Sequence, residues 1–335
     1  MHYALFLSLL SIACILSSSC KSSRIETAKA STQENSHSQY EIVYERKIAD
    51  FFKKGFFKNS EYSDSFEASG VEYFNNKIYI IFDDQAQMFE AILDLNNNKK
   101  IQDGALVNIP FTENRNQMDI EGIDIHPNSG VVRLIEEFLE SEDEDEDEDE
   151  GKMFVLWEKR QDNNLFSARK FFYEFKEKTS GMEGIATRSF EGREYIFILC
   201  EGKPCKKNTR NDAGTIEIFT ENYENSASIE LNGELMLSDY SALDIRNDRF
   251  ALLSQAEGVL LLGKIEGLNQ FIVESRFQFS PSYCNLEGVS FIDDLHLVLV
   301  SDKANDQHKY CKAKERSIHI VKINSLESQL DRMPH

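Results

Sequence analysis

The stretch that decides the fold runs from Asp119 to His126 and reads DIEGIDIH, because it recurs along the chain. Close copies are GMEGI from Gly181 and NLEGV from Asn285. Two weaker copies, ASGV from Ala68 and YSAL from Tyr240, carry serine where the others carry glutamate. A hydrophilic turn and a run of strand-forming residues follow each copy. The repeat therefore predicts a chain built from one β unit used several times.

The spacing of the copies indicates the size of that unit. Measured at the glutamate-or-serine position, the copies lie 46 to 62 residues apart, which is the length of a four-stranded propeller blade. We predict an all-β fold, a five-bladed β-propeller of four-stranded antiparallel blades over residues 40–323. Residues 51–66 fit no strand pattern and leave room for a sixth blade. The strand that begins at Tyr40 is expected to close the ring by pairing with the last blade.

The N-terminal residues resemble an export signal. Tyr3 to Leu16 is almost continuously apolar but short for a membrane span, and small residues then precede Cys20 as in a bacterial lipobox. We expect residues 1–20 to be a lipoprotein-type signal peptide, with Cys20 lipidated and the protein held in the bacterial cell envelope. Residues 21–39 are expected to form a flexible polar tether, and residues 324–335 a polar tail. The start lacks Lys and Arg, so a plainly secreted protein and an uncleaved anchor stay open.

The charge of the chain bears on its partners. A formal net charge of −21 argues against nucleic acid, because phosphate binding needs clustered Lys and Arg. Residues 140–150 are almost all acidic and are expected to form a solvated, disordered loop inside the second blade. A basic partner for this loop is the alternative.

Four cysteines follow the signal. An even number in an exported chain is compatible with disulfides, and the spacing fits neither a redox CxxC motif nor a zinc site. We favour local disulfides between Cys200 and Cys205 and between Cys284 and Cys311. Four reduced, buried thiols are the alternative.

Propeller geometry brings several acids to one face. The innermost strand of a blade begins at that face and the second strand returns to it, so acids at these points should surround the mouth of the central channel. The predicted metal ligands are Glu121, Glu183, Glu287, Glu136, Glu201 and Asp302. Carboxylates this close repel unless a cation, a proton or an arginine intervenes, and calcium takes six to eight oxygens. We predict a calcium site here. The alternative is that the glutamates accept hydrogen bonds from backbone amides of neighbouring blades.

The ordered set of motifs resembles the SdiA-regulated (YjiK-type) β-propeller family. The order Ser-Gly, Glu-Gly, Glu-Gly, Ser-Ala, Glu-Gly is similar to the family's alternation, and so are the segments Glu201–Pro204 and Ser301–Asn305. The resemblance covers about residues 65–323, and it implies five blades, a bound calcium ion and no established enzymatic activity. Ala242 in place of glycine, the acidic insertion and the cysteine pairs depart from the family. NHL-repeat and phytase-like propellers have the same general pattern of repeated motifs.

Three classes of function follow from these patterns, the third being a scaffold with no small ligand whose acidic loop meets a basic protein. The first is a binding module that recognises an unknown small ligand or protein at the channel face. The alternative is a metal-dependent hydrolase acting on a phosphoester, ester or lactone. The chain has neither a Gly-x-Ser-x-Gly elbow nor an HExxH motif, and Arg188 and Lys203 are the nearest candidates for contacting a phosphate. We favour the binding module and assign no catalytic residue.

Overall fold

The computed structural model describes most of the chain after residue 39. The described residues are 40–52, 66–83, 85–94, 100–112, 118–139, 152–160, 162–173, 175, 181–201, 214–303 and 311–324. All of them belong to the second of two compact units, Ser38–His335, and none to the first, Met1–His37. Cys20, Cys205 and the acidic run 140–150 lie outside the described residues. Within the described part, no helix has the length and apolar character needed to cross a membrane.

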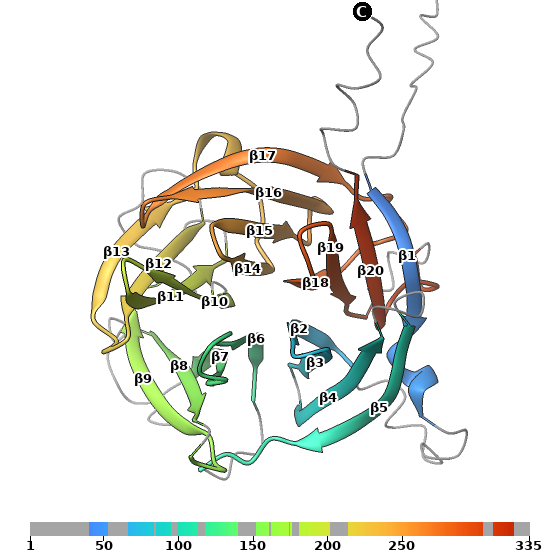
Figure 1. Cartoon of the computed structure of the whole chain (residues 1–335), viewed down its shortest axis with the longest axis horizontal. Coiled ribbons are helices and arrows are strands. Elements are labelled where there is room, and N and C mark those ends of the chain that lie inside the picture. Colours follow the sequence, from blue (N-terminus) through green and yellow to red (C-terminus); the bar gives the residue numbers. More distant parts are fainter. Residues whose placement is uncertain are drawn as a thin grey trace, which may run out of the picture. The chain divides into compact units, whose positions relative to one another are not determined.

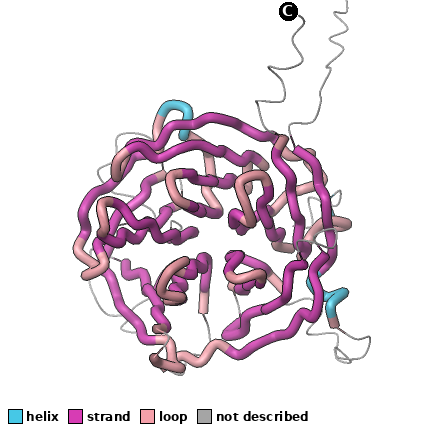
Figure 2. The backbone as a smooth tube through the Cα atoms, viewed as in Figure 1, coloured by secondary structure: helices cyan, strands magenta, loops and turns pink. Residues whose placement is uncertain are grey.

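In the described residues, twenty strands make up five sheets, each with four antiparallel strands; Figures 1 and 2 show how the sheets are arranged around a centre. The first blade consists of β2 (Ala68–Phe74), β3 (Lys77–Phe82), β4 (Gln85–Asp94) and β5 (Lys100–Asn108). The second consists of β6 (Ile120–Ile125), β7 (Val132–Leu139), β8 (Lys152–Lys159) and β9 (Ser167–Tyr173). The third consists of β10 (Met182–Phe190), β11 (Arg193–Cys200), β12 (Thr215–Thr220) and β13 (Asn225–Glu230). The fourth consists of β14 (Ala242–Arg246), β15 (Arg249–Ser254), β16 (Val259–Glu266) and β17 (Gln270–Gln278).

The fifth blade joins the two ends of the propeller. It contains β18 (Leu286–Phe291), β19 (His296–Ser301), β20 (Ser317–Ile323) and, as its outermost strand, β1 (Tyr40–Lys47). Strand β1 runs antiparallel to β20, with Tyr40 opposite Ile323. The predicted fold class is therefore confirmed as a five-bladed propeller, closed by the strand that begins at Tyr40. Two short 3₁₀ helices, η1 (Ile48–Phe51) and η2 (Gly233–Leu235), are the helical segments in the described residues.

The blades are held together by apolar residues at every junction between neighbours. Five buried hydrophobic clusters each combine residues from two adjacent blades. In the cluster between the first and second blades, for example, Ile81 packs with Leu134 and Trp157, all of them fully buried. Burial of apolar surface is the main favourable contribution to folding, so each junction stabilises the ring.

The repeated motif lies where the inner strands come closest together. In four blades the glutamate or serine sits in a β-bulge, because the register shifts by one residue across it. The next residue is glycine for a steric reason. A Cβ on Gly184 would lie 2.9 Å from the backbone nitrogen of Leu243, and one on Gly288 would lie 2.8 Å from that of Val71, each in a neighbouring blade. The central void at this level is only about 10 Å³, so the axis is almost filled.

Candidate functional site

Two rings of polar side chains surround the axis where the inner strands begin. The inner ring is the repeated glutamate-or-serine position, and the outer ring is the equivalent residue at the end of each returning strand. The inner ring comprises Ser69, Glu121, Glu183, Ser241 and Glu287. The outer ring comprises Asp83, Glu137, Glu201, Gln255 and Asp302. We call these two rings the carboxylate mouth. Most of its members line one cavity of about 160 Å³.

Two groups of three carboxylates, formed by acids of the mouth and the adjacent Asp119, have the spacing of metal ligands. One is Asp119, Glu121 and Glu137, and the other is Glu137, Glu183 and Glu201; within each group the ligand oxygens lie within 4.8 Å of one another. Two oxygens that bind the same calcium ion at roughly 2.3–2.6 Å are at most about 5 Å apart. Each group is therefore compact enough to share an ion, and Glu137 belongs to both.

Burial and mutual repulsion raise the pKa values of the inner glutamates. The pKa of Glu121 lies well above its usual value because of burial and then the charges of Glu183 and Asp119. The pKa of Glu183 is raised in the same way by burial, Glu137 and Glu201. Both side chains nevertheless keep some accessible surface, as expected for groups that face a cavity. Ionising the set without a counter-charge is unfavourable.

The remaining acids follow the same trend. Burial and then the charge of Asp302 raise the pKa of Glu287 well above its usual value, although Gln255 donates a hydrogen bond to Glu287. Burial and Asp239 raise the pKa of Glu201 to about 8, and burial raises that of Asp302 to about 7. The mouth thus contains more acid than the neighbouring protein groups neutralise.

The two serine copies have a structural explanation. Ser69 Oγ donates a hydrogen bond to the carbonyl of Ile120, and Ser241 Oγ donates one to the carbonyl of Leu286 at 2.8 Å. Each acceptor belongs to the inner strand of the next blade. An ionised carboxylate cannot donate a hydrogen bond. Serine therefore links blades at the positions where a neighbouring carbonyl needs a donor.

Glu136 is the one predicted ligand that the structure places elsewhere. It is 1% exposed and accepts a hydrogen bond from Trp157 Nε1 at 2.8 Å. Neighbouring residues of a strand point to opposite faces, and Glu137 reaches the mouth instead. The sequence interpretation was one residue early. Aligning the returning strands on the partner of the motif glycine, which is Ile135 in this blade, identifies Glu137. The other five predicted ligands lie together at the mouth.

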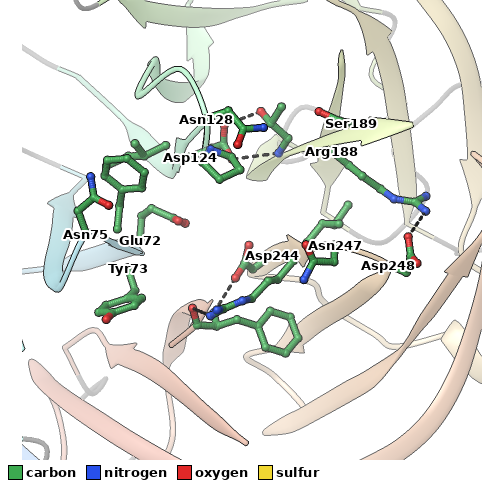
Figure 3. A pocket seen from close by; sticks show the side chains of 17 residues that line it. Glu72, Tyr73, Asn75, Asp124, Asn128, Arg188, Ser189, Asp244, Asn247 and Asp248 are labelled. Atoms are coloured by element: carbon green, nitrogen blue, oxygen red, sulfur yellow. Dashed lines mark hydrogen bonds and ion pairs between the residues drawn. The ribbon is translucent and has the colours of Figure 1, made fainter. Parts of the chain in front are cut away.

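A second and larger cavity lies at the opposite end of the axis, where the inner strands end in hairpin turns (Figure 3). We call it the hairpin cavity. It measures about 580 Å³, and its walls come from all five blades. Residues that line it include Glu72, Asp124, Arg188, Asp244, Arg246 and Phe291. Sequence reasoning did not single out these acids, although Glu72, Asp124 and Asp244 occupy equivalent positions in their strands.

Of the two basic candidates for phosphate contact, the structure describes one, Arg188, and it does not lie at the carboxylate mouth. Arg188 lines the hairpin cavity and pairs with Asp248 at 2.7 Å. Lys203 lies outside the described residues. Of the cysteines, Cys284 and Cys311 form a disulfide, with their Cα atoms 5.9 Å apart. Cys200 is buried, and the bond predicted between it and Cys205 involves a residue that is not described.

Comparison with known proteins gives only distant similarities. No protein-family model matches the chain, and no curated protein matches it either. Glutaminyl cyclase of Myxococcus xanthus is 9% identical with a TM-score of 0.45, over 85% of this chain and 97% of that one. A GH43_1 enzyme of Xanthomonas citri in complex with xylose is 10% identical with a TM-score of 0.43, over 76% and 86%. The PQQ-bound aldose sugar dehydrogenase of Streptomyces coelicolor is 9% identical with a TM-score of 0.41, over 77% and 94%. At these values nothing about activity follows.

Proposed function

We propose that this chain is a ligand-binding β-propeller whose carboxylate mouth holds a calcium ion. The observation that carries the proposal is the pair of three-carboxylate groups that share Glu137, each with its oxygens within 4.8 Å. The raised pKa values of Glu121 and Glu183 add to it, because a bound cation would relieve the repulsion that causes them.

The donor set decides the kind of ion. The grouped side chains offer carboxylate oxygens and no nitrogen or sulfur, whereas structural zinc sites use Cys and His. Calcium accepts six to eight oxygens in irregular geometry, while magnesium requires a nearly ideal octahedron. The grouped acids come from separate segments of the second and third blades, an arrangement that suits the less demanding ion. A bound calcium ion would neutralise the negative charge of the carboxylate mouth and connect these blades.

A calcium titration followed by thermal melting tests the proposal. Calcium at 100 times its dissociation constant stabilises a folded protein by about 2.7 kcal/mol, which corresponds to a melting increase of roughly 5 °C. The increase should be lost in Glu137→Gln and Glu183→Gln. It should be retained in Glu41→Gln, which changes an exposed residue of β1 in the same way. A wild-type protein whose melting temperature does not respond to millimolar calcium would overturn the proposal.

The same variants provide a second readout without calcium. Glutamine has the shape of a protonated glutamate, so at pH 8 it removes repulsion from the calcium-free mouth. Glu183→Gln should therefore melt at or above the wild-type temperature when a chelator is present, and below it when calcium is present. A purely structural role for Glu183 as a hydrogen-bond acceptor predicts a loss of stability in both conditions.

The cellular setting of this function is proposed from the sequence. Membership of the SdiA-regulated family is supported by the ordered motifs, and a lipid anchor at Cys20 by the preceding apolar segment. Incorporation of labelled palmitate that disappears in Cys20→Ser tests the anchor; labelling that persists in this variant, or none in the wild type, contradicts it. The acidic run 140–150 is proposed to meet a basic partner.

The metal-dependent hydrolase is the lesser candidate. Of its two phosphate-contacting candidates, Arg188 gives no support, since it lines the hairpin cavity at the other end of the axis and pairs with Asp248. Turnover of phosphoester, ester or lactone substrates that a chelator abolishes would replace the binding module with this enzyme.

A further inference from the structure

The hairpin cavity has the size of a small-molecule site. Its volume of about 580 Å³ lies within the roughly 300–1,000 Å³ that ligand pockets occupy. Residues from all five blades line it. The void of about 10 Å³ at the motif glycines separates it from the carboxylate mouth. The two ends of the axis are therefore distinct sites.

Three acids converge on the inner end of this cavity. Figure 3 shows Glu72 pointing into its centre, with Asp124 and Asp244 on the neighbouring walls. Two of the acids are held by adjacent blades. Asp124 accepts a hydrogen bond from the backbone N–H of Thr187 at 2.9 Å, and Asp244 accepts one from that of Phe291 at 2.6 Å. These two carboxylates therefore have a structural task.

Glu72 differs from the other two acids. Its one side-chain hydrogen-bond partner among the described residues is the hydroxyl of Ser290, at 3.4 Å. It also keeps accessible surface toward the cavity. Burial, followed by the charges of Asp244 and Asp124, raises its pKa well above the usual value. Glu72 is thus an incompletely bonded acid that faces an open space.

The arginines of the cavity are engaged by the protein. Arg188 extends away from the centre toward Asp248 and also donates to the carbonyl of Gly267, both at 2.7 Å (Figure 3). Arg246 donates to the carbonyl of Phe291 at 3.3 Å and to that of Ile292. The charge of Arg246 lowers the pKa of Glu72, but less than burial and the two aspartates raise it. Around Glu72 the two acids Asp124 and Asp244 outnumber the one base, Arg246.

We propose that the hairpin cavity binds a small organic cation, with an ammonium group of the ligand donating to the carboxylate of Glu72. Such a ligand supplies the missing hydrogen-bond donor and the missing positive charge together. The amide side chains of Asn75, Asn128 and Asn247 line the cavity and are available to the rest of the ligand. A neutral polyol would also form hydrogen bonds here, but the excess of acids over bases around Glu72 favours the cation. The inference rests on the proposed function only in that the chain binds a ligand, and it does not depend on calcium.

Isothermal titration calorimetry with two molecules of equal length separates charge from shape. Putrescine carries two ammonium groups, and butane-1,4-diol carries hydroxyls in their place. We expect putrescine to bind the full chain saturably, with one molecule per chain, and the diol to bind at least tenfold more weakly. Glu72→Gln should weaken putrescine binding roughly tenfold to hundredfold, the range for a hydrogen bond to a charged group. Glu41→Gln, an exposed change on β1, should leave it unaltered.

The titration also reports the proton on Glu72. Asp244 and Arg246 of β14, Asp124 of β6 and Ser290 of β18 surround this carboxyl. Burial and the two aspartates raise its pKa, and the opposing effects of Ser290 and Arg246 are smaller. An ammonium ligand favours the ionised form, so binding should release a proton and tighten from pH 5 to pH 8. The measured enthalpy should then change with the ionisation enthalpy of the buffer. A bound diol would release no proton.

Three results would overturn the inference: no putrescine binding up to 10 mM, equal binding of the diol, or putrescine binding that Glu72→Gln leaves intact. The comparison of putrescine with the diol uses the wild-type chain, so it stands even where the variant fails to fold. Calcium-dependent melting is measured on the same protein. A calcium response without putrescine binding overturns only this inference, and putrescine binding without a calcium response overturns only the calcium site.

Discussion

Replacing Arg133 by methionine should destabilise the propeller far more than the loss of one surface charge would. Arg133 is 4% exposed and connects the second and third blades. Its guanidinium donates to Thr187 Oγ1 at 2.9 Å and to Glu158 Oε2 at 3.3 Å, lies 3.6 Å from Asp124 Oδ2, and also pairs with Glu194. Methionine fills a similar volume but leaves these acids without their shared cation.

The structure supplies the magnitude and a matched control. Removing one partner of a buried ion pair costs about 3–5 kcal/mol, because the other charge stays buried and unpaired. Arg160 contacts the same Glu158, at 2.7 Å, but its side chain is 61% exposed. An exposed pair contributes about 0–1 kcal/mol. Arg160→Met therefore removes an arginine from the same carboxylate without the effect of burial.

Urea unfolding at pH 7 measures both variants. We expect Arg133→Met to lower the free energy of unfolding by about 3–5 kcal/mol and Arg160→Met by at most about 1 kcal/mol. The reasoning is refuted if the two losses are equal, or if Arg133→Met is as stable as the wild type. Since Arg133 also supports Asp124, which lines the hairpin cavity, the variant should weaken putrescine binding as well.

Three further outcomes follow from the two rings and the close approach of the inner strands. Burial and neighbouring acids raise the pKa of Glu201 to about 8, so the folded calcium-free protein keeps a proton that the unfolded chain has already lost, and its stability falls as the pH rises from about 4.5 to 8. Calcium offsets that loss, so the calcium-induced increase in melting temperature should be larger at pH 8 than at pH 5; equal increases would contradict this. Ser241→Ala should cost about 1–3 kcal/mol in urea unfolding, because the buried carbonyl of Leu286 loses its donor, and a neutral result would show that water replaces the hydroxyl. Gly288→Ala should cost about 1–3 kcal/mol, because its Cβ would lie 2.8 Å from the backbone nitrogen of Val71, and wild-type stability would mean that the blades can separate slightly.

The blades could be predicted from sequence because each must repeat the same alternation of turn and apolar strand. The motif around Glu121 marks the start of an inner strand in every blade, and the strand at Tyr40 had no other partner in a closed ring. Edge strands of a sheet are unfavourable when left unpaired, so closure by that strand follows from general principles. Fold class therefore depended on information that a single sequence contains.

The details of the carboxylate mouth depended on information that a single sequence does not contain. Glu136 and Glu137 are adjacent acids on β7, and side chains alternate along a strand, so Glu136 points to Trp157 and Glu137 to the axis. The residue type is the same at both positions, so composition gives no sign of which acid reaches the axis. The hairpin cavity was missed for a related reason. Glu72 stands out because the backbone N–H of Phe291 donates to Asp244, whereas Glu72 receives only the hydroxyl of Ser290 among the described residues. These contacts join blades that are far apart in the sequence.

The strand order of the fifth blade has a consequence for incomplete chains. Among the described strands, β1 is synthesised first but pairs with β20, which is synthesised last, so the ring cannot close until Ile323 has been added. The Cys284–Cys311 disulfide lies within the later part of this blade and does not include β1. Loss of residues 40–47 would leave β20 with a row of unpaired backbone groups, and loss of β20 would do the same to β19. Trimming at either end thus exposes one and the same sheet, and an exposed sheet edge is where chains join one another and aggregate.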